Sequence, residues 1–164
     1  MARKIVLVDA SPLIGLARVG GLAWLRKLYP NLAITRAVRT EVLAGLGLPG
    51  EAEIADAIRR RRIEVLGRVP ATPLFERLAE GEASILRAAL SFGPNALVII
   101  DDLAARREAQ RLRLPLTGTA GVIVEAKRAG LIKRARPVFE QLMANDFRLS
   151  SELVEAILAE LGEK

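Results

Sequence analysis

Short β-branched apolar runs alternate along the chain with longer stretches in which apolar residues recur at helical spacing. The short runs predict five strands, at residues 4–8, 32–34, 63–66, 97–100 and 116–117. The first is typical of a buried strand because four consecutive apolar residues, Ile5 to Val8, end at a polar turn. Strands that alternate with helices predict an α/β fold, in which a parallel sheet carries helices on both faces.

Capping residues and glycines predict where the helices begin and end. We expect Ser11 to cap the first helix, with Pro12 at its first helical position, and Thr35 to cap the third. The C-terminal helices are amphipathic, which suits either self-association or a bound partner helix. The predicted helices span residues 12–19, 22–29, 36–44, 51–61, 74–79, 82–92, 103–113, 120–129, 138–144 and 151–161.

The length of 164 residues suits one domain, 1–164, with a core over residues 4–132 and C-terminal helices within 137–161. A hydrophobic share of 51% with 27% charged residues excludes a disordered chain. Apolar runs fall well short of the roughly 18 residues that a membrane span needs. Asp9 interrupts the first run, and no small-residue cleavage site follows it. We therefore expect a soluble, cytoplasmic protein that does not enter membranes.

The complete absence of Cys and His narrows the possible chemistry. It excludes disulfides, thiolate or imidazole metal sites, a cysteine nucleophile and any catalytic triad that needs a histidine base. Carboxylates, hydroxyls, Lys and Arg remain as reactive groups.

A net charge of +6 and a pI near 10.5 favour a polyanionic partner. Arg provides most of the 25 basic residues, and guanidinium groups match phosphate geometry. Genomic base composition or heat adaptation would give the same bias. Aromatic residues are scarce, at 4%, so recognition of a nucleic acid would depend on phosphate and metal contacts rather than on base stacking.

Acidic residues directly follow two of the predicted strands. Asp9 follows the first strand, and Ser11 already supplies a helix cap there, so folding does not account for its carboxylate. Asp101 and Asp102 follow the fourth strand, where one of them, most plausibly Asp102, caps the next helix. The alternative for this pair is a solvated turn with Arg106 as its partner.

Two further carboxylates lie on or beside apolar helix stripes. Glu41 borders the stripe that contains Val38 and Val42, and Glu82 lies three residues before Ile85. For Glu82, a favourable position at a helix N-terminus is an equally good explanation.

The usual winding of such a sheet makes its first and fourth strands neighbours, so these carboxylates would converge at the point where strand order reverses. Without His or Cys, the natural partner for them is a hard divalent cation, Mg²⁺ or Mn²⁺. A carboxylate-bound ion of this kind is suited to phosphodiester hydrolysis.

Two more residues are candidate substrate contacts. Arg106, one turn beyond Asp102, is placed either to meet a phosphate or to balance the acidic cluster. Thr119 follows the fifth strand and either places a hydroxyl near a phosphate or caps the next helix.

The ordered set of acidic motifs resembles the PIN-domain nucleases, and within them the VapC-like and extended PIN-like toxins. Four segments carry the resemblance: VDASPLI at Asp9, TRAVRTEVLAG at Glu41, LAEGEASILRAA at Glu82 and LVIIDDLAARREA at Asp101-Asp102. The segment LPLTGTAGVIVEAKRAGLI, residues 114–132, is also similar to the extended group, so the resemblance covers about residues 4–132.

The resemblance implies a sheet in the order 3-2-1-4-5 and an acidic pocket that binds one or two Mg²⁺ or Mn²⁺ ions. It also implies ribonuclease activity, a homodimer and a small cognate antitoxin. Asp9, Glu41 and Glu82 match the first three acidic positions, and either Asp101 or Asp102 matches the fourth. Ser11 matches a hydroxyl two residues after the first Asp. Glu82 departs from the Asp that many relatives carry.

Three other classes of protein are alternatives to a nuclease. A non-catalytic nucleic-acid-binding or protein-interaction module would keep the fold without metal competence. A phosphoacceptor receiver domain needs an Asp at the end of the third strand, which here ends Val65-Leu66-Gly67. A dinucleotide-binding domain needs G-x-G-x-x-G after the first strand, which is absent.

Overall fold

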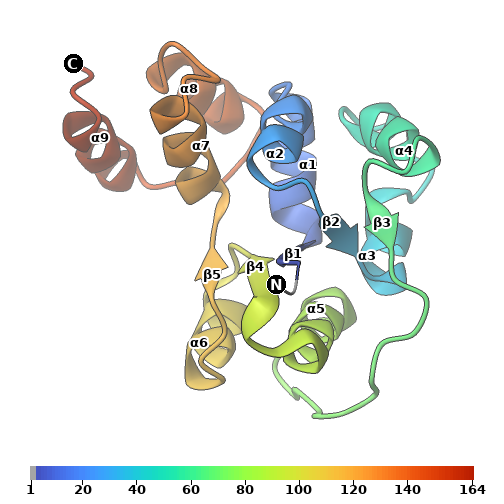
Figure 1. Ribbon diagram of the computed structural model, residues 1–164. Helices are drawn as coiled ribbons and strands as arrows, with labels where there is room; N and C mark the ends of the chain where they lie inside the picture. The colour runs from blue at the N-terminus through green and yellow to red at the C-terminus, as the bar shows by residue number, and fades with distance from the viewer. Residues whose placement is uncertain (1–2) are drawn as a thin grey trace.

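A five-stranded parallel sheet forms the centre of the protein in the computed structural model, which describes residues 3–164 (Figure 1). Neighbouring strands pair in the order β3-β2-β1-β4-β5, and every pair is parallel. The predicted order is therefore confirmed. The strands are β1 (Ile5–Val8), β2 (Leu32–Ile34), β3 (Glu64–Val65), β4 (Ala96–Ile99) and β5 (Leu116–Thr117).

Helices cover both faces of this sheet, as the alternating pattern predicts. Figure 1 shows α1, α2 and α7 on one side, with α5 and α6 on the other. The helices are α1 (Ala10–Arg18), α2 (Leu22–Leu28), α3 (Arg36–Val42), α4 (Glu51–Arg59), α5 (Glu80–Phe92), α6 (Leu103–Arg111), α7 (Thr119–Arg128), α8 (Arg136–Ala144) and α9 (Ser151–Glu160), and a short 3₁₀ helix, η1, spans Gly93–Asn95.

The central strands are buried on both faces, which explains why they consist of continuous apolar runs. Leu7 of β1 and Val98 of β4 are fully buried. Phe139 of α8 and Leu158 of α9 belong to the same buried cluster. Residues 3–164 include no helix with the length and apolar character needed to cross a membrane.

The first helix begins two residues before its predicted start. It starts at Ala10, so Asp9 rather than Ser11 occupies the N-cap position, and the Asp9 side chain makes no capping hydrogen bond. Pro12 lies in the first turn, where its missing N–H would have no helical partner anyway. The Ser-Pro signal thus located the helix but not its first residue.

The predicted helix at residues 74–79 is wrong, because this segment is irregular, with one turn at residues 76–77, and α5 begins only at Glu80. Contacts with a side chain of α5 are found at this segment in place of helical hydrogen bonds. The buried Arg87 donates from Nε to the Pro73 carbonyl oxygen at 2.8 Å and from Nη1 to Glu80 at 2.9 Å. Its guanidinium also lies over the ring of Phe75.

Candidate active site

The carboxyl ends of β1 and β4 bring the first and fourth acidic segments together. Val8 pairs with Ile99 at the ends of these strands, and the Asp9 N–H donates to the Ile99 carbonyl oxygen at 3.0 Å. Strand order reverses here, because β1 continues through α1 toward β2, whereas β4 leads through α6 to β5 on the other side. In open parallel sheets this is the position at which ligands bind.

Asp9 is a buried carboxylate with an unpartnered oxygen. The residue is 4% exposed, and its Oδ1 has no hydrogen-bond partner among the described residues. Burial raises the pKa of Asp9 from 3.8 to about 7, opposed by a hydrogen bond from the Ala10 backbone and reinforced by the charges of Glu82, Glu41 and Asp101. A carboxylate in this environment would gain strongly from a cation.

Glu41 and Asp9 meet at the start of α5. A Cβ atom added to Gly81 would lie 2.9 Å from Glu41 Oε2 and 3.8 Å from Asp9 Oδ1. The Glu41 carboxylate therefore lies so close to the backbone of α5 that a methyl group at position 81 would displace it, whereas Asp9 Oδ1 would be in ordinary contact with that group.

Glu82 starts α5 and also faces the other acids. Its Oε2 accepts a hydrogen bond from the Ala79 N–H at 3.1 Å, so the predicted helix-terminal role is present. Burial raises the pKa of Glu82, and repulsion from Asp102 and Glu41 adds to this shift, whereas the bond from Ala79 opposes it. The helix-terminal role and membership of the acidic cluster coexist in this residue.

The adjacent Asp101 and Asp102 have different partners. Asp102 caps α6 by accepting a hydrogen bond from the Ala105 N–H at 2.9 Å, which confirms the predicted cap. Asp101 accepts from the Thr119 N–H at 2.8 Å and from the Thr119 hydroxyl at 2.6 Å. Because Asp102 is the cap of α6, Asp101 is the member of the pair that is not needed to start this helix.

Thr119 is fully buried, and its hydroxyl is bonded to Asp101. Gly118, not Thr119, occupies the N-cap position of α7, so the prediction of Thr119 as a helix cap is wrong. A direct contact between this hydroxyl and a substrate does not fit the geometry either, because the side chain is covered. Sequence spacing located Thr119 beside the acidic cluster but did not reveal that it orients Asp101.

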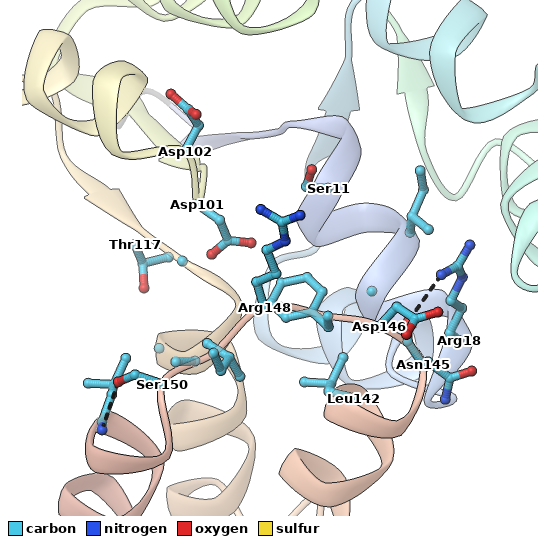
Figure 2. Close-up of a pocket in the computed structure, with 18 of the residues that line it drawn as sticks. Ser11, Arg18, Asp101, Asp102, Thr117, Leu142, Asn145, Asp146, Arg148 and Ser150 are labelled. Carbon is cyan, nitrogen blue, oxygen red and sulfur yellow. Dashed lines mark hydrogen bonds between the residues drawn. The ribbon is translucent and has the colours of Figure 1, made fainter.

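Arg106 and Ser11 lie at the edge of the same site. Arg106 donates from Nη1 to the Ile100 carbonyl oxygen at 2.8 Å, and no ion pair with Asp102 is present among the described residues. A Cβ on Gly118 would lie 2.6 Å from Asp101 Oδ1 and 2.9 Å from this Nη1, so Arg106 adjoins Asp101. Ser11 is exposed on α1 and lines the cavity (Figure 2).

A cavity of about 830 Å³ opens beside these residues. Glu82, Asp101 and Asp102 line one part of it, while Asp9 and Glu41 are not among the residues that line it. The segment 145–150, between α8 and α9, lines another part. The sequence patterns predict no role for this segment, in which Arg148 is the one cationic residue.

The oxygen-only donor set fits a hard divalent cation chemically. The unpartnered Oδ1 of Asp9 points to the same conclusion, because an isolated buried carboxylate oxygen is costly. As the side chains lie, however, no group of three carboxylates among residues 3–164 is close enough to hold a metal ion. Side-chain rotation would have to accompany binding, and Glu82, Asp101 and Asp102 also accept hydrogen bonds from the main chain.

A sheet in this order, with carboxylates gathered where strand order reverses, defines a PIN-like α/β protein. The chain belongs to the family DUF3368, a PIN domain, whose family model matches residues 5–163. No curated protein matches the chain. PIN domains are generally nucleases, and they typically use divalent metal ions.

Proposed function

We propose that this protein is a Mg²⁺- or Mn²⁺-dependent ribonuclease. The observation that carries the proposal is the environment of Asp9, which is buried at the switch point with an unpartnered Oδ1 and is electrostatically coupled to Glu41, Glu82 and Asp101. A structural aspartate would normally be paired. Membership of the PIN-domain family supports nuclease activity, and the basic balance of the chain supports a polyanionic substrate.

The ion would be held by four carboxylates, those of Asp9, Glu41, Glu82 and Asp101. Asp102 would remain beside this site, because its side chain caps α6. When bound, the ion would polarise the scissile phosphate and lower the pKa of a water molecule. Thr119 would keep Asp101 turned toward the site through its hydroxyl. Glu41 or Glu82 would accept the proton of the attacking water.

The finer assignment is a toxin of a toxin–antitoxin pair, acting on RNA in the cytoplasm as a homodimer with a small cognate antitoxin. The resemblance to VapC-like sequences motivates this assignment. Leu103, which is 61% exposed directly after Asp102, and the exposed Leu153 at the cavity provide apolar surface that a protein partner would cover.

The Asp9→Asn variant tests the proposed activity. The wild-type protein should cleave an end-labelled single-stranded RNA in Mg²⁺ or Mn²⁺ but not in EDTA. The variant should lose at least about 100-fold in rate, because it removes a charge from the transition-state environment while keeping the side-chain shape.

Asp56→Asn is the matched control, since Asp56 of α4 pairs with Arg59 and Arg60, away from the site. Its rate should equal that of the wild type. RNA binding without cleavage in every variant and with either metal would contradict the proposal and support the non-catalytic module.

A further inference from the structure

The segment 145–150 crosses the cavity opposite the acidic cluster, although it lies more than 40 residues from Asp101 along the chain (Figure 2). We propose that Arg148 of this segment binds a phosphate of the RNA substrate. This proposal rests on the proposed function. It assigns a substrate contact to a residue in the connection between α8 and α9.

One side of Arg148 is anchored by the ring of the preceding residue, Phe147, which packs against α1. A Cβ atom on Gly15 would lie 2.6 Å from Cε2 of Phe147, so the ring occupies the space that any other residue at position 15 would need. Arg18 donates from Nη1 to the Asn145 carbonyl oxygen at 3.3 Å. These contacts attach the residues just before Arg148 to α1, the helix whose N-cap residue is Asp9.

The other side is anchored by the core and by the start of α9. Leu149 packs against the buried cluster. The Ser150 hydroxyl accepts a hydrogen bond from the Leu153 N–H at 3.1 Å and caps α9. The backbone of Arg148 is thus held on both sides, which reduces the conformational entropy lost when its side chain binds a ligand.

The side chain of Arg148 differs from the other arginines that line the cavity. Arg18 and Arg106 donate to backbone carbonyl oxygens. Arg148 is exposed and forms no hydrogen bond or ion pair within residues 3–164. Figure 2 shows its guanidinium directed into the space between Ser11 and Asp101.

The charges around this space fit a bound phosphodiester. Carboxylates alone would repel a phosphate, whereas a guanidinium on the opposite wall attracts it and can donate two parallel hydrogen bonds. A phosphate between Asp101 and Arg148 would meet the metal-binding acids on one side and a free cation on the other. RNA would therefore run along the cavity between the β4–α6 turn and the α8–α9 connection.

Steady-state cleavage of a labelled single-stranded RNA by the wild type, Arg148→Ala and Arg148→Lys tests this assignment. Loss of a charge-assisted contact should raise KM about tenfold in Arg148→Ala. Lysine should restore part of the affinity, because it keeps the charge but not the two-bond geometry. Fluorescence anisotropy should measure binding of the same RNA in EDTA across a salt series. The affinity should be highest for the wild type, lower for Arg148→Lys and lowest for Arg148→Ala. The slope of log affinity against log salt concentration should become shallower by about one in Arg148→Ala, as expected for the loss of one phosphate contact.

Arg62→Ala is the matched control for net charge, because Arg62 is exposed before β3, at the opposite end of the strands. It should leave KM and RNA affinity unchanged. Calorimetric titration with Mn²⁺ should give equal affinity for the wild type and Arg148→Ala, which shows that the acidic site is intact.

Three outcomes would overturn the assignment: unchanged KM in Arg148→Ala, equal weakening by Arg62→Ala, or faster cleavage by Arg148→Ala, which would indicate a cation that competes with the metal. A wild-type protein that binds RNA in an Arg148-dependent way but never cleaves it would instead reject the proposed nuclease function while supporting the phosphate contact. A wild type that neither binds nor cleaves RNA would reject both.

Discussion

Burial of the Asp9 carboxylate makes the stability of the metal-free protein dependent on pH. Its pKa is about 7 in the folded chain and near 3.8 when the group is solvated. Between these values the folded state retains a proton that the unfolded state releases. The free energy of unfolding therefore falls as pH rises from about 4 to about 7 and is level above that range.

The Asp9→Asn variant should remove this dependence. In EDTA, its stability advantage over the wild type should grow by about 2–4 kcal/mol between pH 4 and pH 8, because only the wild type has to ionise a buried group. Urea unfolding at a series of pH values measures the difference. A constant difference across the series would show that Asp9 titrates normally. At pH 8, Mn²⁺ should stabilise the wild type but not the variant.

The hydroxyl of Thr119 donates one of the two hydrogen bonds that orient Asp101. Thr119→Val preserves the side-chain shape but removes the donor that holds Asp101 at 2.6 Å. Affinity for Mn²⁺ should fall about tenfold, as is usual when a group that orients a ligand is lost. Thr119→Ser keeps the hydroxyl and should retain the affinity in the same calorimetric titration. Equal affinity in all three proteins would exclude this role.

At the scale of elements, the close approach of α3 and α5 positions the acidic cluster. Gly81→Ala would place a methyl group 2.9 Å from Glu41 Oε2. Because Glu41 is exposed and its carboxylate can move, global stability should change by less than about 1 kcal/mol, whereas displacement of the carboxylate should lower the cleavage rate at least tenfold.

Gly67→Ala is the control for Gly81→Ala, since a Cβ atom there would meet no atom within 4 Å. Both variants would be compared by thermal unfolding and by cleavage rate. Equal rates in the two variants would show that Glu41 does not need its observed position.

The elements that sequence patterns predicted correctly are those with a strong local signal. The central strands β1, β2 and β4 are short apolar runs, and Asp102 caps α6 as its position indicates. Residues 74–79 have helical spacing but form no helix, and Arg87 of α5 contacts the beginning of this stretch at Pro73 and Phe75. Local spacing carries no information about such a distant partner.

At the scale of the whole molecule, the C-terminal helices share the core of the sheet. We propose that residues 3–164 unfold as one unit. Phe139 of α8 is fully buried, so Phe139→Ala should cost about 3–5 kcal/mol and should destabilise the sheet together with the helix.

Circular dichroism and the fluorescence of Trp24, the only tryptophan, would follow the unfolding of Phe139→Ala. Coincident transitions at a lower urea concentration are expected. Phe92→Ala is the control, because that ring is 42% exposed and its loss should cost less than about 1 kcal/mol. Separate transitions for the two probes would show that the C-terminal helices form an independent unit.

The sequence by itself determined the α/β class, the positions of the strands and the acidic residues at their ends, because apolar periodicity and helix capping are local properties. Only the tertiary structure decided how these acids are used. It buried Asp9 with an unpartnered Oδ1, paired Asp102 with the start of α6 and Asp101 with Thr119, and brought Arg148 across the cavity from the carboxylates. Burial and partner choice depend on chain segments that are distant in sequence, and no local pattern encodes them.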